Sequence, residues 1–329
     1  MLNPLHLRTL TAVLQTGSFA VAARRLGYTP SAVSQQIAAL ERAAGLPLFE
    51  REAHGIRPTP AAAWLRGRGQ EVLAALGALQ DDLRGLADGA TGTVRLGSFP
   101  TASEHLLPSA LAALAALAAG SPSVEVLLDE GEPGELVPRV HDGDLDVALV
   151  YRYTRVPVRR PRALALTPLL REDLVLLLPP GHRSAGEEEV RLGDLADAPW
   201  ITTRQGTAGA TCLQRVCAEA GFEPRVGYRS NDYDVLRGFV RAGLGVALVP
   251  VLGSVPDPGV ATARLAGVDV HRHVGVLTRP GLGNPAVAGV VAALTAAATD
   301  RHDPERGVCR EPALPATPPQ FSPGPGRSR

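Results

Sequence analysis

The pattern of apolar and polar positions predicts three short helices near the start of the chain. Apolar residues recur at helical spacing in residues 5–16, 18–26 and 29–44, and a glycine follows each stretch. Ser18 and Thr29 stand where the N-caps of the second and third helices are expected. The glycine turn between these two helices predicts a helix-turn-helix arrangement.

The third predicted helix has a packing side and an outward side. Val33, Ile37 and Leu40 lie together on the packing side. The outward side is short, polar and almost free of acidic residues, and it consists of Ser31, Ser34, Gln35, Ala38 and Arg42. A helix exposed only for solubility more often carries Glu and Arg four positions apart, whereas this surface suits a groove lined by base edges and phosphates. The alternative is a small packing unit with no nucleic-acid role.

Short apolar pieces at residues 46–49 and 56–59 predict a two-stranded wing after the third helix.

A long helical stretch is predicted at residues 60–88. Apolar or small residues recur in it at intervals of three and four: Ala62, Leu65, Gly69, Val72, Leu76, Leu79, Leu83 and Leu86. Such a heptad seam favours a coiled coil with a second helix over a lone helix packed on its own domain.

Strands and helices alternate in the rest of the chain. After a hinge at residues 90–92, the pattern predicts strands separated by helices, the first of which spans residues 103–119. A crossover rich in proline and arginine at residues 152–166 leads to a second such run, and another crossover at residues 261–268 leads back to the first. We therefore expect two α/β lobes with parallel sheets and a cleft between them.

Composition narrows the function. The 329 residues suffice for two or three domains, and the formal net charge is zero. Attraction to DNA therefore has to come from a local positive patch that is repeated in a dimer. No basic and apolar leader is present, and no apolar run of membrane-spanning length is free of charges and helix breakers. These features predict a cytoplasmic protein with no membrane partner.

The sequence offers little that could support catalysis or metal binding. Its cysteines, Cys212, Cys217 and Cys309, have neither a disulfide framework nor zinc-ligand spacing. Cys212 and Cys217 fall on one predicted helix with side chains pointing in different directions, which favours buried structural roles over a redox pair. Serine-hydrolase, zinc-protease and phosphate-loop motifs are absent from the sequence. We expect no enzyme activity, no cofactor and no metal.

The amino-terminal residues resemble a family signature. Residues 17–51, GSFAVAARRLGYTPSAVSQQIAALERAAGLPLFER, are similar to the signature of LysR-type transcriptional regulators, which are bacterial DNA-binding proteins. The matching residues are Gly17, Ser18 and Phe19, the pair Ala22 and Ala23, Ser34, Gln36 and Ile37, the pair Leu40 and Glu41, and Leu48, Phe49 and Arg51. One difference is Ala62, where the family usually has glycine.

The resemblance implies a role in DNA binding for several residues. It places base-reading or groove-lining positions on the third helix, at Pro30, Ser31, Ser34 and Gln35. It implies a contact between Arg51 and the DNA backbone, and we expect Arg42 and Arg57 in the same interface with double-stranded DNA. It also implies a homodimer or homotetramer, held through the long helix, that sets two reading heads on one site.

The resemblance further implies the fold, an α/β protein with an amino-terminal all-α winged helix-turn-helix. The two lobes would form an effector-binding domain similar to periplasmic solute-binding proteins. The expected domains are the DNA-binding domain (1–59), the linker helix (60–89), lobe I (90–162 with 268–299), lobe II (163–267) and a disordered proline-rich tail (300–329).

Candidate effector-binding residues follow from the expected sheets, because ligands gather at the carboxyl ends of parallel strands. Lobe I offers Ser98, Pro100, Thr101 and Ser103, and lobe II offers Thr202 and Thr203. Hydroxyls beside helix starts with free backbone N–H groups favour an anion, so we expect a small anionic effector. The alternative to ligand binding is that each of these Ser and Thr residues only caps a helix. For the whole chain, the alternative to a DNA-binding regulator is a small-molecule-binding protein that regulates a partner protein.

Overall fold

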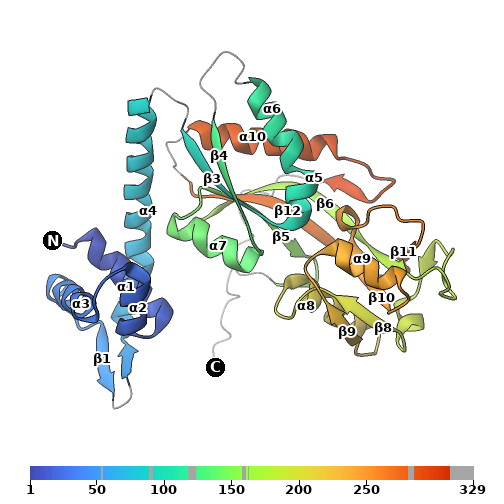
Figure 1. Cartoon of the computed structure of the whole chain (residues 1–329), viewed down its shortest axis with the longest axis horizontal. Coiled ribbons are helices and arrows are strands. Elements are labelled where there is room, and N and C mark those ends of the chain that lie inside the picture. Colours follow the sequence, from blue (N-terminus) through green and yellow to red (C-terminus); the bar gives the residue numbers. More distant parts are fainter. Residues whose placement is uncertain are drawn as a thin grey trace, which may run out of the picture. The chain divides into compact units, whose positions relative to one another are not determined.

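The chain divides into two compact units (Figure 1). The computed structural model describes residues 1–52, 55–88, 92–117, 124–157, 161, 163–280 and 285–311. Unit 1 contains residues 1–150, 158–165 and 277–294, and unit 2 contains residues 151–157, 166–276 and 295–329. The domain boundaries expected from the sequence stay predictions, and the expected hinge residues Ala90 and Thr91 lie outside the described residues.

Unit 1 begins with a helical head. Its elements are α1 (Pro4–Thr16), α2 (Phe19–Leu26), α3 (Pro30–Ala44), the wing strands β1 (Phe49–Glu52) and β2 (Gly55–Pro58), and the long helix α4 (Pro60–Asp88). Gly17, Gly27 and Gly45 end the first three helices with φ of 66°, 70° and 70°, a left-handed conformation that glycine adopts without strain. The helix-turn-helix and wing expected from the sequence are present.

One apolar core holds the head together. Its buried members come from all four helices and the wing: Leu7, Leu10, Ala12, Val13, Ala22, Ala23, Val33, Ile37, Leu40, Leu48, Ala62 and Leu65. Phe19 and Phe49 meet edge to face with ring centroids 5.5 Å apart, and this contact joins α2 to the wing. Glu41 adds a polar tie, because its Oε1 accepts hydrogen bonds from the backbone N–H groups of Leu48 and Phe49.

The seam of α4 has two environments. Ala62 and Leu65 are buried in the head, and a Cβ on Gly69 would lie 3.1 Å from Cδ2 of Leu7. Farther along, Val72, Leu76, Leu79 and Leu83 are exposed over 37–57% of their surface. The first part of the seam therefore packs on its own domain, and the second part is available to another helix. The side chain of Leu86 lies outside the described part of the chain.

The α/β part of unit 1 is built on three parallel strands in the order β4 (Glu125–Glu130), β3 (Thr93–Ser98), β5 (Val147–Tyr153). Its helices are α5 (Pro100–His105), α6 (Leu107–Leu117), α7 (Pro133–Asp142) and α10 (Pro285–Asp300). The single helix predicted at residues 103–119 is wrong, because the chain breaks at Leu106. Pro108 explains the break, since proline has no N–H to continue the ladder of helical hydrogen bonds.

A buried ion cluster fixes the start of β5 in unit 1. Asp146 is 4% exposed and accepts hydrogen bonds from the backbone N–H, Nε and Nη2 of Arg95 at 2.7–3.0 Å. Arg279 also reaches Asp146 and donates to the carbonyls of Val140 and Leu145. The guanidinium of Arg279 therefore joins α7, β5 and the end of β12 in one polar network.

Unit 2 surrounds the long strand β6 (Ala165–Leu178). Its other elements are β7 (Glu189–Val190), η1 (Leu192–Leu195), β8 (Pro199–Thr202), α8 (Ala208–Glu219), β9 (Arg225–Arg229), α9 (Tyr233–Arg241), β10 (Val246–Pro250), η2 (Val251–Gly253), β11 (Ala261–Leu265), β12 (His271–Thr278) and β13 (Val308–Arg310). β9, β8 and β10 are parallel, whereas β10, β11 and β13 each pair antiparallel with β6. The sheet is therefore mixed where a parallel sheet was expected.

Two elements of unit 2 differ from the sequence-based expectation. The crossover predicted at residues 261–268 contains β11, because the alternation of exposed and buried residues there pairs with β6. The tail predicted to be disordered from residue 300 instead contains the strand β13, in which Val308 is buried at 4% exposure. Residues 312–329 lie outside the described residues. In the described part of the chain, no helix is long and apolar enough to span a membrane.

Candidate functional site

The outward face of α3 is exposed as the sequence predicts. Ser31, Gln35 and Arg42 are exposed, Ser34 is half-buried, and Pro30 starts the helix. The Thr29 hydroxyl accepts a hydrogen bond from the N–H of Ala32 at 3.2 Å and so caps the helix. Because the opposite face is fixed in the head core, α3 presents these side chains from a rigid support. That geometry suits insertion into a major groove.

Gln36 has a structural role that the sequence analysis missed. The hydroxyl of Thr9, which is fully buried, donates to Oε1 of Gln36 at 2.5 Å and ties α1 to α3. The signal was present in the spacing, since residue 36 is three after Val33 and four before Leu40 on the packing side. Two adjacent glutamines thus have different surroundings, with Gln35 facing solvent and Gln36 facing α1.

The wing carries the remaining predicted DNA contacts. Arg57 of β2 forms an ion pair with Glu50 of β1, and both side chains are more than half exposed. Such an exposed pair contributes about 0–1 kcal/mol, so a phosphate could replace Glu50 at little cost. Arg51 belongs to β1, and its side chain lies outside the described part of the molecule.

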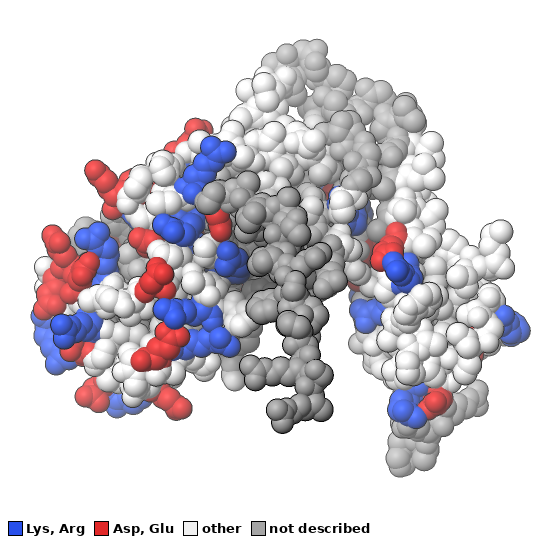
Figure 2. All heavy atoms as spheres, turned by 180° about the vertical axis from the view of Figure 1, so that it is seen from behind, with Lys and Arg blue, Asp and Glu red and all other residues white. Residues whose placement is uncertain are grey.

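Charged side chains on the surface of unit 2 are of both signs. On the face seen in Figure 2, basic and acidic side chains of unit 2 are interspersed and form no patch of one sign. This pattern agrees with a formal net charge of zero. Any electrostatic preference for DNA therefore depends on the arginines of the head rather than on the whole chain.

In unit 1, the predicted effector-binding residues cluster where β3 passes into α5. Ser98 and Thr101 are buried at 0% and 3% exposure, and the Ser103 hydroxyl is buried without a partner in the described part of the chain. The expectation of free backbone N–H groups fails at two positions, because Ala102 and Ser103 both donate to the carbonyl of Phe99 at 3.0 Å. Pro100 has no N–H. Among the hydroxyls, that of Ser98 is within 3.4 Å of the carbonyl of Phe99, to which it donates.

In unit 2, the predicted residues lie where β8 passes into α8. Thr202 and Thr203 are buried at 4% and 8% exposure. The hydroxyls of Thr203 and Thr207 are 2.7 Å apart, and that of Thr207 also accepts from the N–H of Ala210. Thr207 is thus a helix cap, and it engages Thr203. The two predicted sets belong to different units, so their joint binding of one ligand stays a prediction.

The structure adds Tyr153 to the surroundings of Thr203. A Cβ built on Gly209 would lie 2.8 Å from Oγ1 of Thr203 and 3.5 Å from the hydroxyl oxygen of Tyr153, so only glycine fits at this close approach. Burial raises the pKa of Tyr153 well above its usual value, which keeps the phenol neutral and able to donate. Sequence spacing gave no signal that Tyr153 and Thr203, which are fifty positions apart, both approach Gly209.

A buried ion pair underlies the same part of unit 2. Nε of Arg272 donates to Oε1 of Glu172 at 2.6 Å, and both side chains are at most 1% exposed. Glu172 also accepts from the N–H of Leu252, and the Arg272 guanidinium lies 5.2 Å from the ring centroid of Tyr151. Burial acts to lower the pKa of Arg272, but the interactions with Glu172, Tyr153 and Tyr233 together outweigh burial and raise the pKa. The charged pair therefore joins β6, which carries Glu172, to β12, which carries Arg272.

Cys212 and Cys217 are unsuited to redox chemistry. Burial raises the pKa of both Cys212 and Cys217 to about 12, and for Cys212 the neighbouring Cys217 adds to the effect. The thiolate is the reactive form of cysteine, so both side chains are inert near neutral pH. Among the described residues, no group of three His, Cys, Asp or Glu side chains could hold a metal ion.

Two family models match this chain. Residues 5–63 match the bacterial regulatory helix-turn-helix protein of the lysR family, and residues 87–299 match the LysR substrate binding domain. The chain belongs to the LysR family. This confirms the family resemblance and the expected fold of a winged helix-turn-helix, a linker helix and a two-lobed α/β domain. A LysR-type transcriptional regulator thus carries its helix-turn-helix in α1–α3 and its effector-binding domain in the later strands and helices.

Curated relatives cover most of the chain. A small neutral protease regulatory protein of Streptomyces coelicolor is 36% identical over 80% of this chain and 77% of its own length. A probable hydrogen peroxide-inducible genes activator of Mycobacterium avium is 31% identical over 84% of this chain and 88% of its own. The transcriptional dual regulator GltC of Bacillus subtilis is 32% identical over 67% of this chain and 71% of its own.

Solved structures share the fold. The full-length regulator CbnR complexed with its target DNA has a TM-score of 0.53 and 24% identity, covering 90% of this chain and 100% of the other. A mutant of OxyR from Corynebacterium glutamicum has a TM-score of 0.54 and 24% identity, covering 91% and 92%. At this identity the likeness establishes the fold alone.

Proposed function

We propose that this LysR-type regulator reads its operator with the outward face of α3. The supporting observation is the exposure of Ser31, Gln35 and Arg42 on a helix whose other face is locked in the head core. Short polar side chains let the helix backbone approach the base edges, and Arg42 adds attraction to phosphate. Pro30, Ser34, Arg51 and Arg57 complete the proposed interface, with the two arginines of the wing contacting the DNA backbone.

We also propose that the chain acts as a dimer or tetramer. The supporting feature is α4, whose apolar residues from Val72 to Leu83 are exposed although the helix starts inside the head core. Pairing this surface with the α4 of a second copy buries it and presents two α3 helices to one pseudo-palindromic site.

We also propose the chemical class of the effector. It is a small anion, bound by Ser98, Pro100, Thr101 and Ser103 of unit 1 and by Thr202 and Thr203 of unit 2. Neutral hydroxyl donors at the ends of strands suit a carboxylate, which accepts several hydrogen bonds and has none to donate. The Tyr153 phenol beside Thr203 supports this assignment because it too is a neutral donor.

A thiol-based response to peroxide is not part of the proposal, although one relative is named as a probable activator of peroxide-inducible genes. Cys212 and Cys217 are buried and have raised pKa values. Thiols that sense oxidants are exposed and have lowered pKa values. A bound metabolite is therefore the signal that this site supports best.

A binding assay tests the DNA-reading proposal. Fluorescence anisotropy with the DNA upstream of the protein's own gene, and with a scrambled fragment of equal composition, gives the ratio of the two affinities. A specific regulator binds its site about 10³-fold or more tighter than bulk DNA at physiological salt. Equal affinity for every fragment of the upstream region and for the scrambled DNA would contradict the proposal.

Calorimetry tests the effector proposal. A panel of small carboxylates is titrated into the wild type and into Thr101→Ala and Thr202→Ala. A carboxylate that binds the wild type should lose about 0.5–1.5 kcal/mol of binding free energy in each variant, the usual contribution of one hydrogen bond. Thr207→Ser, which keeps a capping hydroxyl, serves as the control. Unchanged affinity in both alanine variants would remove these residues from the site.

A further inference from the structure

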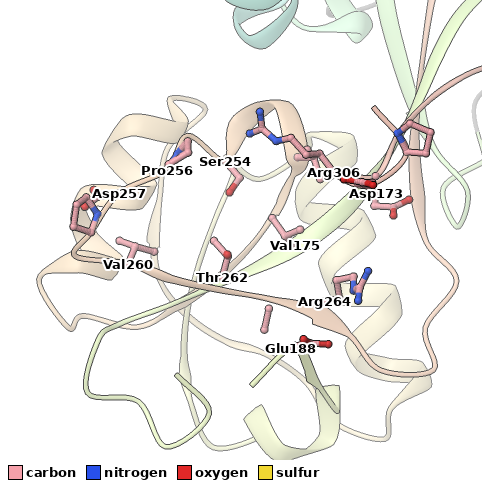
Figure 3. Close-up of a pocket in the computed structure, with 16 residues that line it drawn as sticks. Asp173, Val175, Glu188, Ser254, Pro256, Asp257, Val260, Thr262, Arg264 and Arg306 are labelled. Carbon is pink, nitrogen blue, oxygen red and sulfur yellow. The ribbon is translucent and has the colours of Figure 1, made fainter. Parts of the chain in front are cut away.

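Unit 2 contains a hollow that is lined by none of the residues proposed to bind the effector. It has a volume of about 830 Å³, within the range of small-molecule sites. Its walls come from the β6–β11 ladder, the loop after η2 and the turn that precedes β13 (Figure 3). None of the residues that line it was predicted from the sequence to contact a ligand.

The floor of this hollow is apolar and belongs to paired strands. Val175 of β6 lies directly opposite Arg264 of β11, and both line the hollow. Val251 and Val260 are buried beneath it at 8% and 9% exposure. Thr262 is exposed on β11 and points into the hollow (Figure 3). A ligand therefore needs an apolar body to cover these side chains.

The wall formed by residues 304–307 is held in place. The N–H of Asp173 donates to the carbonyl of Gly307 at 2.8 Å, and β13 continues from there along β6. Gly307 has a φ of 77°, and a Cβ there would lie 2.6 Å from Oδ2 of Asp173. The turn thus fixes Glu305 and Arg306 at the rim, beside Asp173.

The charges of the rim favour a cation. Four carboxylates and two guanidinium groups line the hollow. Three of these groups already have partners: Asp257 pairs with Arg237 and Arg241, Asp173 contacts Nδ1 of His271 at 2.8 Å, and Arg264 pairs with Glu189 at 3.9 Å. This leaves Glu188 and Glu305 against Arg306. Neither Glu188 nor Glu305 forms an ion pair with another described residue. Figure 3 places Asp173, Glu188, Arg264 and Arg306 toward one end of the hollow and Val260 toward the other.

We propose that this hollow is a second ligand site, which takes a small organic monocation with an apolar chain. The ammonium group lies between the carboxylates of Glu188 and Glu305, and the chain covers Val175 and Val260. The excess of one carboxylate over the arginines matches one positive charge, and the length of the apolar floor gives the ligand its orientation.

The test uses the full-length protein and three probes of equal chain length, hexylamine, hexanoate and hexanol. Isothermal calorimetry should show binding of hexylamine at millimolar concentration and weaker or no binding of the other two. Glu188→Gln should weaken hexylamine binding about two- to fivefold, as expected for one partly exposed charge contact. Glu187→Gln, the same change one residue away and outside the lining, should leave it unchanged.

A variant that fills the hollow tests whether hexylamine binds there. Thr262→Trp replaces an exposed side chain, so it should keep the wild-type circular dichroism spectrum and Tm while abolishing hexylamine binding. If hexylamine binds Thr262→Trp as it binds the wild type, the site lies elsewhere and the proposal is overturned. Preference for hexanoate, or no binding of hexylamine to the wild type, would overturn it as well.

Discussion

At the residue scale, adjacent side chains of α3 have separate functions. Gln35 is exposed on the outward face, whereas Gln36 accepts a hydrogen bond from Thr9 inside the head. A helix turns by 100° at each residue, so one position decides whether a glutamine is exposed or packed. The sequence predicted the outward set and missed the packing role of Gln36, because a polar side chain on the inner face needs a partner that only folding supplies.

Gln35→Ala should weaken binding to the operator by about 1–3 kcal/mol and leave binding to scrambled DNA nearly unchanged, since a lost base contact affects only the correct sequence. Anisotropy titrations on both DNAs measure the two effects. Gln36→Ala is the matched control, which should lower Tm because it removes the hydrogen bond from Thr9 that ties α1 to α3. A loss of equal size on both DNAs for Gln35→Ala would count against direct reading.

Thiol reactivity follows from the raised pKa values of Cys212 and Cys217. Their pKa values are about 12 in the fold, against an ordinary value of 9.0. The thiols therefore stay protonated at pH 8 and contribute stability that is lost as the pH rises from about 9 through 12. Ellman's reagent should therefore label about one thiol, Cys309, in the native protein and all three in guanidinium. Rapid native labelling of all three would contradict the burial of the pair.

At the element scale, α4 shows how one periodic pattern can serve two contacts. The heptad seam predicted a long helix, and the helix is present. The seam does not face one partner throughout, because Ala62, Leu65 and Gly69 pack on the head and the later residues are exposed. Periodicity gives the apolar side of a helix, but the partner of each turn depends on which segments the fold brings to it.

Leu79→Glu should shift the protein from dimer or tetramer toward monomer, because a charge in the seam opposes burial of side chains worth about 1.5–3 kcal/mol each. Size-exclusion chromatography with light scattering measures the mass. Gln80→Glu adds the same charge beside the seam and should preserve the assembly. An unchanged mass for Leu79→Glu would show that the assembly does not use this part of α4.

At the scale of the whole molecule, the order of strands in unit 2 was beyond sequence pattern. β6 pairs with β10, β11 and β13, which lie 70 to 140 positions later in the chain. β13 extends the fold beyond the last helix predicted from the sequence, and the turn that precedes it supplies one wall of the hollow proposed to bind a cation. Its three residues carry too short a pattern to be recognised before the partner strand is known.

Removal of residues 301–329 should destabilise the protein. Burial of Val308 contributes about 1.5–3 kcal/mol, and Glu311 is hydrogen-bonded to His273, so we expect Tm to fall by roughly 3–10 °C. Differential scanning calorimetry measures the change. A chain ending at residue 315 keeps β13 and should melt within about 1–2 °C of the full-length protein. If both truncations melt alike, β13 does not contribute to stability.

The sequence by itself determined the head of this protein, the helical character of α4, the family and the alternation of strands and helices. Each depends on local spacing, on caps and glycine turns, or on a dense signature. The tertiary structure decided the role of Gln36, the two environments of α4, the antiparallel partners of β6, the approach of Tyr153 and Thr203 to Gly209, and the hollow beside β11. These features join residues that are distant in the chain, and the free energy that fixes them comes from burial and pairing that exist only after folding.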